Sequence, residues 1–130
     1  MPHDAETDKP LDTVPTPDLD AMTPLCAIAA KLALLDFAAG VREDPPRSNR
    51  GPVIDRYLIG HDQKGGWLLT GKGAAKGAPW CARACVWWVE EAALQLGRPS
   101  PVGVAARGGG LASAYKLRAW ARTRSRNDPA

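Results

Sequence analysis

The sequence predicts a mostly α-helical fold in which a few helices are joined by long loops rich in glycine and proline. Two segments, 24–39 and 80–96, carry apolar residues at the three- and four-residue spacing of one helix face. The chain contains 13 glycines and 12 prolines among 130 residues, so its elements should be interrupted often. After residue 104 there is no alternating or continuous run of apolar β-branched residues, which is the pattern expected of strands.

The first helix is expected over residues 24–39. Thr23 can cap it, Pro24 suits its first position and Gly40 can end it. Cys26 is interpreted as a small buried hydrophobic residue of this helix. The apolar face that we expect to pack inward comprises Leu25, Ile28, Leu32, Leu35 and Ala39, flanked by Ala27, Leu34 and Phe37.

A second, short helix is expected from Pro52 to the residue before Gly60, after a loop over 41–51 that two prolines interrupt. Its inward-facing residues should be Val53, Tyr57 and Leu58. The glycine-rich segment 61–79 is interpreted as a long loop, with room for a brief strand at its apolar triplet Trp67-Leu68-Leu69.

The strongest helix is expected over 80–96, with Gly97 ending it. Trp87 and Trp88 are adjacent and cannot point the same way, so we expect one of them in the core and the other at an edge. The apolar face comprises Ala82, Cys85, Val86, Val89, Ala93 and Leu96.

A last helix is expected over 111–122, after a further glycine- and proline-rich loop. Its candidate buried residues are Leu111, Ala114, Tyr115, Leu117 and Trp120. The predicted organisation is therefore a disordered acidic leader over 1–22, one domain over 23–122 and a loose tail over 123–130.

The net charge of +3 is unevenly distributed along the chain. Residues 1–20 carry six acids and one base, whereas residues 107–126 carry six bases and no acid. A basic segment of this kind is either a solvated helix face with a frayed end, which we favour, or a tail that binds a polyanion. Nucleic acid is not the partner that we expect.

Composition also argues against several classes of protein. The N-terminal residues lack the apolar segment of a signal peptide, which predicts a cytoplasmic protein, and no apolar run is long enough to span a membrane. Three cysteines are an odd number for a disulfide framework. His3 and His61 complete no zinc pattern, and the Gly71-Lys72-Gly73 fragment is not a phosphate-binding loop. No metal or cofactor is expected.

The segment that indicates chemistry is Gly77-Ala78-Pro79-Trp80-Cys81, where a cysteine opens the strongest helix. The start of a helix offers positive partial charge and free backbone N–H groups. Both favour the thiolate form of a cysteine, which is its nucleophilic form, and an N–H there could stabilise an oxyanion. Cys81 is therefore a candidate nucleophile, whereas Cys85, one turn further along, suits packing.

Several motifs, taken in order, resemble the front part of CHAP domains, the papain-like α+β cysteine amidases and endopeptidases that cut peptidoglycan. They are Gly40-Val41-Arg42-Glu43, Asn49-Arg50-Gly51-Pro52 with Tyr57, Pro79-Trp80-Cys81-Ala82, and Ser113-Ala114 followed by Trp120. The resemblance covers roughly residues 25–122. It implies that the chain comprises mainly the helical N-terminal half of that fold, and that its partner is peptidoglycan or the peptide stems of peptidoglycan.

The same resemblance implies that Cys81 is the nucleophile and that Glu43, Asn49 and Trp80 lie near the substrate groove. The general base of the family is a histidine on a strand well after the cysteine, but no histidine follows Cys81 in this sequence. His61 precedes the nucleophile in a loop and is not expected to replace that base.

Three hypotheses follow. The chain is a truncated hydrolase that is inactive alone; or it is a non-catalytic module that binds cell-wall peptide or an anionic polymer; or its base comes from another chain. The last hypothesis requires self-association through an exposed helix face, for example at Trp87 or Trp88.

Overall fold

The computed structural model describes residues 23–69 and 78–127, and the predicted acidic leader over 1–22 lies outside this part. The described residues form four α-helices and two 3-10 helices and contain no strand, which confirms the mostly helical fold class. None of these helices is long and apolar enough to cross a membrane. In chain order the elements are α1 (Pro24–Ala38), α2 (Pro52–Ile59), η4 (Lys64–Leu69), α3 (Cys81–Leu96), η5 (Gly103–Gly109) and α4 (Ala114–Asn127).

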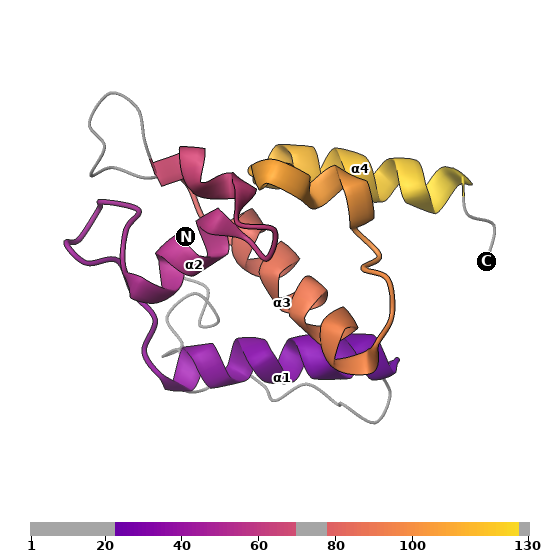
Figure 1. Cartoon of the computed structure of the whole chain (residues 1–130), viewed down its shortest axis with the longest axis horizontal. Coiled ribbons are helices and arrows are strands. Elements are labelled where there is room, and N and C mark those ends of the chain that lie inside the picture. Colours follow the sequence, from indigo (N-terminus) through magenta and orange to yellow (C-terminus); the bar gives the residue numbers. More distant parts are fainter. Residues whose placement is uncertain (1–22, 70–77, 128–130) are drawn as a thin grey trace, which may run out of the picture.

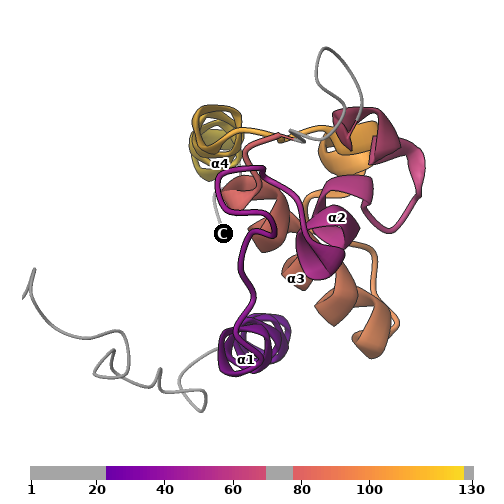
Figure 2. The same ribbon diagram turned by 90° about the vertical axis from the view of Figure 1, so that its left-hand side faces the viewer.

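Helix α3 occupies the middle of the molecule, with α1 and α4 on opposite sides of it (Figures 1 and 2). It contacts α1, α2 and α4, while η4 packs against both α2 and η5. The long helix that begins at the candidate nucleophile is therefore the element on which the others assemble.

Helix α1 begins and ends where the sequence predicts. The Thr23 side chain accepts a hydrogen bond from Cys26 N at 3.4 Å, and Gly40 follows the helix with a φ of +73°. The predicted burial of its apolar face is wrong, because no residue of α1 is buried and Leu35 is 60% exposed. Cys26 is also exposed, contrary to expectation. Apolar residues occur on several sides of α1, but only one side packs on α3, so within the described part of the chain Leu34, Leu35 and Phe37 remain exposed.

A polar contact fixes α1 to the rest of the fold. Asp36 Oδ2 accepts hydrogen bonds from Trp88 Nε1, at 2.8 Å, and from the Tyr57 hydroxyl. Tyr57 is fully buried, and burial, followed by its bond to Asp36, raises the pKa of its hydroxyl. The Tyr57 ring also lies 6.0 Å from Trp87 and 5.8 Å from Trp88, between ring centroids. Both tryptophans are half-buried around Tyr57, so the expected division between a core and an edge tryptophan is wrong.

Two hydrophobic clusters form the core. One contains Ile54, Leu58 and Leu68, and the other contains Val86, Val102, Ala106 and Leu111. Tyr57 and Leu58 are buried as predicted, but Ile54 takes the place expected for Val53, which is only half-buried. Positions 54, 57 and 58 share one helix face, so the inward side of α2 is shifted by one residue.

Helix α3 buries Ala82, Val86 and Ala93 as expected and ends at Gly97, whose φ is +64°. The predicted packing role of Cys85 is wrong, because Cys85 is exposed on the same side as Cys81, one turn away. The unexpected buried residue is Arg83, which is 1% exposed.

Arg83 Nη1 donates hydrogen bonds to Ala106 O at 3.2 Å and to Gly110 O at 2.7 Å, and burial lowers the pKa of its guanidinium. A buried cation that is bound by backbone carbonyls therefore joins α3 to the segment around η5.

The two predicted loops after α2 and α3 contain short 3-10 helices. The expected brief strand at Trp67 is wrong, because residues 64–69 form η4, and Trp67 Nε1 donates to Gly108 O at 2.7 Å. Residues 70–77 lie outside the described part of the chain.

The last helix differs from prediction at both ends. It begins at Ala114 and continues to Asn127, past the predicted end at residue 122, because no glycine or proline interrupts it before Pro129. Leu117 and Trp120 pack against the core as expected, but Ala114 and Tyr115 face solvent.

Candidate active site

Cys81 is the first residue of α3, and it is exposed. Trp80 precedes the helix in the capping position but forms no side-chain cap, and its carbonyl accepts the first helical bond, from Ala84 N at 2.8 Å. The backbone N–H groups of the first turn have no partner within the helix. The thiol therefore lies at a helix start and is exposed.

The carboxylate of Glu43 brings the other predicted site residues together. Its Oε1 accepts hydrogen bonds from Asn49 N at 3.1 Å and from Trp80 Nε1 at 3.3 Å, and its Oε2 accepts one from Arg47 N at 3.1 Å. Glu43 thus joins the 43–50 loop to the residue directly before Cys81. Three of the four residues that the sequence indicated are thus joined by hydrogen bonds, and the fourth, Cys81, directly follows Trp80 in the chain.

Asn49 contributes through its backbone. Arg47 and Asn49 both adopt positive φ, at +65° and +56°, a conformation that asparagine tolerates better than most residues. Their N–H groups point to the two oxygens of Glu43. The expected contribution of Asn49 to the groove therefore begins with loop shape, because its backbone rather than its side chain contacts Glu43.

An ion pair fixes the end of this loop to α2. Arg50 donates to Asp55 through Nε at 2.8 Å and through Nη2 at 3.0 Å, and Gly51 N donates to the same carboxylate at 3.3 Å. The bond from Arg50 is the main reason that the pKa of Asp55 is lowered. The 43–50 loop is therefore held by the bonds to Glu43 within it and by the Arg50–Asp55 ion pair at its end.

Trp80 is held on two sides. Its indole N–H is bound by Glu43, and its ring stacks on Tyr57 with centroids 6.1 Å apart and planes inclined by 22°. It also packs against the cluster of Ile54, Leu58 and Leu68 and remains half-buried. Trp80 therefore packs as part of the core directly before Cys81 in the chain.

His61, which follows α2, contacts a part of α3 that is far from the candidate nucleophile. Its Nε2 is 2.8 Å from Glu91 Oε2, and its ring stacks on Trp87 with centroids 4.7 Å apart. Glu91 follows Cys81 by about 15 Å of helix at 1.5 Å per residue. His61 therefore does not lie where a base for Cys81 is needed.

The second thiol of α3 has a different environment. Although the residue is exposed, nearby atoms desolvate the Cys85 sulfur, and this desolvation, followed by the proximity of Cys81, raises the pKa of its thiol. The fraction of the Cys85 thiol that is ionised near neutral pH is therefore smaller than in an unperturbed cysteine.

Two features of this region were not predicted from the sequence. The Trp80–Glu43 hydrogen bond joins residues 37 positions apart, and no local pattern signals it. Arg56 lies 4.2 Å from the centroid of the Trp87 ring, on the helix that also carries Tyr57.

Among the described residues, no group of three or more histidines, cysteines or acids is arranged to hold a metal ion. Comparisons of the chain with protein-family models, with curated proteins and with solved structures find no match. The functional argument therefore depends on the chemistry and geometry of the chain's own residues.

Proposed function

We propose that this chain carries the nucleophile-bearing part of a CHAP-type cysteine peptidoglycan hydrolase and is inactive alone. Cys81 is the nucleophile, and Glu43, Asn49 and Trp80 form the adjoining part of the substrate groove. The observation that supports this proposal is the convergence of Asn49 N and Trp80 Nε1 on Glu43, directly before an exposed cysteine that opens a helix.

The proposed reaction is acyl transfer from an amide of a peptide stem. The Cys81 thiolate attacks the carbonyl carbon, an S–C bond forms, and the C–N bond breaks as the leaving amine takes a proton. Water then releases the acyl group from sulfur. Both steps need a base that removes and returns a proton, and no histidine follows Cys81 in these 130 residues.

Selective labelling tests the role of Cys81. A stem peptide that carries a thiol-reactive carbonyl mimic should label Cys81 faster than Cys26, which is exposed elsewhere. The matched controls are Cys26→Ser, which should keep the fast labelling, and Cys81→Ser, which should lose it. Equal labelling of Cys26 and Cys81 would show that the groove does not direct the reagent, and it would remove support for the nucleophile.

Turbidity of purified peptidoglycan tests the inactivity of the chain. We expect no clearing by the chain alone, at any pH between 5 and 9, because the base is missing. Clearing that disappears in the Cys81→Ala variant would contradict this expectation and would indicate a base from a second copy of the chain.

A non-catalytic module that binds cell-wall peptide is the second candidate. It is favoured by the same observation, because Trp80 is held in place by Glu43 and Tyr57 whether or not chemistry follows. Co-sedimentation with insoluble peptidoglycan distinguishes the two functions. A pure binder retains binding in Cys81→Ala, loses it in Trp80→Ala, and shows no selective labelling of Cys81.

A further inference from the structure

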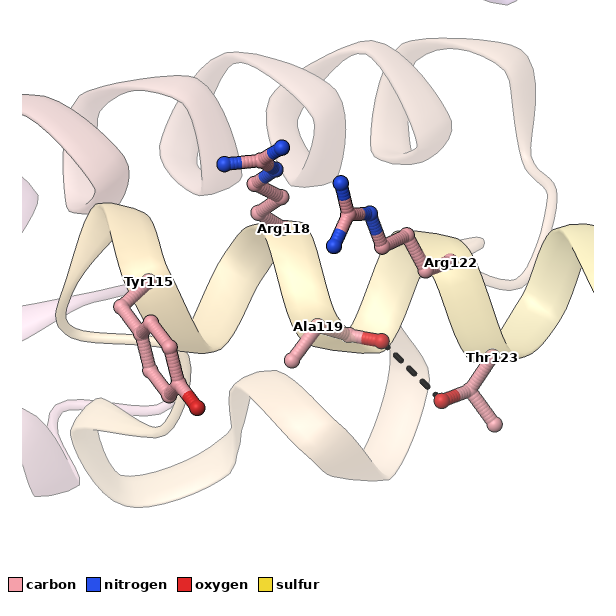
Figure 3. Close-up of a pocket in the computed structure, with 5 residues that line it drawn as sticks. All are labelled: Tyr115, Arg118, Ala119, Arg122 and Thr123. Atoms are coloured by element: carbon pink, nitrogen blue, oxygen red, sulfur yellow. Dashed lines mark hydrogen bonds between the residues drawn. The ribbon is translucent and has the colours of Figure 1, made fainter.

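Helix α4 has one face in the core and one face in solvent. Leu117 and Trp120 pack against the cluster that contains Val86 and Leu111. The opposite face is exposed and carries Tyr115, Arg118, Ala119, Arg122 and Thr123 (Figure 3). Tyr115 is 82% exposed, which is a large exposure for an aromatic side chain.

These five residues line a hollow of about 300 Å³ on the surface of the helix. Arg118 and Arg122 point to the same side of α4, and Tyr115 leans to the other side (Figure 3). Ala119 lies between them, and its small side chain leaves the space open. The exposed face therefore has two cationic groups along one edge and one aromatic ring near the other edge.

The two arginines are not neutralised within the described part of the chain, where no carboxylate lies within ion-pair distance of Arg118 or Arg122. They are four residues apart on one helix, and like charges at this spacing repel each other. No acid occurs between residues 107 and 126. An anion bound between the two guanidinium groups would relieve this repulsion.

The chemistry of the pair indicates which anion fits. A guanidinium presents a planar set of donors that matches two oxygens of a phosphate, and two such groups one helical turn apart can bind neighbouring phosphates. A single aromatic ring lies beside them. Binding of single-stranded nucleic acid usually adds several aromatic rings on which successive bases stack, and this face has only one.

We propose that the exposed face of α4 binds the phosphodiester chain of an anionic cell-wall polymer of the polyol-phosphate (teichoic acid) type. Arg118 and Arg122 bind the phosphates, and Tyr115 covers the polyol segment. The choice of a wall polymer rests on the proposed function, because such polymers occur beside peptidoglycan. The site is separate from Cys81, so each proposal can fail without the other.

Binding of the full chain to purified, lipid-free poly(glycerol phosphate) tests this proposal, with sodium chloride at 50 and 200 mM. If two phosphates are bound, affinity should weaken about tenfold across this range. Arg118→Gln with Arg122→Gln should weaken binding about tenfold or more at 50 mM, and Ala119→Glu should abolish it because it places a carboxylate in the hollow. Circular dichroism should show unchanged helix content in these surface variants.

The matched control replaces two other exposed arginines, Arg42→Gln with Arg98→Gln, which lowers the net charge equally. It should change the affinity for the polymer less than about twofold. Equal weakening by both pairs would mean that net charge alone drives binding and would overturn the site. Absence of binding, or tighter binding of a single-stranded oligonucleotide than of the polymer, would also overturn the proposal.

The Cys81→Ala variant keeps the two proposals distinguishable. It should bind poly(glycerol phosphate) as the unaltered chain does. If Cys81 labels selectively but the polymer does not bind, only the α4 proposal fails. If the polymer binds at α4 and Cys81 does not label selectively, the site remains and the hydrolase proposal fails.

Discussion

Trp80 Nε1 donates a hydrogen bond to Glu43 Oε1 at 3.3 Å, joining the residue before α3 to a loop 37 positions earlier. The same oxygen accepts a hydrogen bond from Asn49 N. Because the three groups share one carboxylate, the loop and the start of α3 should gain or lose order together. The position of the 43–50 loop beside the start of α3 therefore depends on the half-buried carboxylate of Glu43.

The first prediction concerns this contact. Trp80→Phe keeps an aromatic ring on Tyr57 but removes the N–H donor, so it should lower the free energy of unfolding by about 1 kcal/mol. Glu43→Gln should cost about 1–2 kcal/mol, because the amide NH₂ replaces one acceptor oxygen. Urea denaturation of both variants and of the double variant measures their coupling, which should be about 0.5–1.5 kcal/mol.

Trp67→Phe is the matched control for that cycle, because it also removes an indole donor, which is bound to Gly108 O. Its effect should add to that of Glu43→Gln. If Glu43→Gln and Trp80→Phe were also additive, the hydrogen bond between the two residues would contribute nothing to the fold.

The second prediction concerns the thiols of α3. Because desolvation raises the pKa of the Cys85 thiol, iodoacetamide at pH 7.5 should modify Cys81 before Cys85. Peptide mapping by mass spectrometry measures both rates. In Cys81→Ser the pKa of Cys85 should fall somewhat, since Cys81 also raises it, and alkylation of Cys85 should quicken. Faster modification of Cys85 than of Cys81 in the unaltered chain would contradict the assignment of Cys81 as the reactive thiol.

The third prediction concerns a close approach between Gly60 and Arg83. Gly60 has φ of +78° and ψ of 173°, and a Cβ there would lie 2.6 Å from Arg83 Nη2. Gly60→Ala should therefore destabilise the fold by about 1–3 kcal/mol through backbone strain. The clash of the new Cβ with Arg83 should add to this cost. In an Arg83→Ala background the clash is gone, so the same change should cost less. Thermal and urea denaturation measure both costs.

Gly97 offers the control for the strain alone. Its φ is +64°, but nothing lies within 4 Å of a Cβ built there, so Gly97→Ala should cost only about 1–2 kcal/mol, with or without Arg83. A cost for Gly60→Ala that is identical in both backgrounds would show that Arg83 moves away freely.

The fourth prediction concerns acid stability. Asp62 accepts hydrogen bonds from Gly108 N at 2.8 Å and from Lys64 N at 3.0 Å, and these bonds lower its pKa in the folded state. Its carboxylate therefore contributes full stability above the unfolded pKa, about 3.9, and loses this contribution as the pH falls through the lower folded value.

Asp62→Asn should accordingly flatten the dependence of stability on pH below about pH 4, measured as urea midpoints. The exposed Asp44 is the control, and Asp44→Asn should leave most of that slope in place. An unchanged slope in Asp62→Asn would show that the two backbone bonds do not depend on the charge.

Local signals explain why much of the helical fold could be predicted. Thr23, Pro24 and Gly97 act within one turn of their helix ends, so the start of α1 and the end of α3 can be read from neighbouring residues. The sequence indicated Glu43, Asn49 and Trp80, and the structure joins them by hydrogen bonds, whereas their role in a site stays a prediction. No local pattern in the sequence specifies the conformation of the 43–50 loop that turns Glu43 toward Trp80.

Long-range packing explains the errors. Arg83 looks like a surface residue in sequence, but its acceptors are the carbonyls of Ala106 and Gly110, far along the chain. Leu35 and Cys26 look buried, because an apolar helix is normally covered on most sides. Only the arrangement of α1 against α3 decides which side is covered, and helical spacing does not specify that arrangement.

The last prediction follows from the uncovered side of α1, where Leu34, Leu35 and Phe37 are exposed. Apolar surface gains about 25 cal/mol for each Å² removed from water, so we expect the chain to self-associate through α1 at high concentration. Leu35→Glu should shift sedimentation velocity at 100 µM toward the monomer, because it places a charge in that contact. Tyr115→Glu, a change at an even more exposed residue on α4, should leave the distribution unaltered. If both variants acted alike, association would depend on net charge rather than on the apolar side of α1. A monomer at all concentrations would remove the possibility that a second copy supplies the base that the proposed hydrolase function requires.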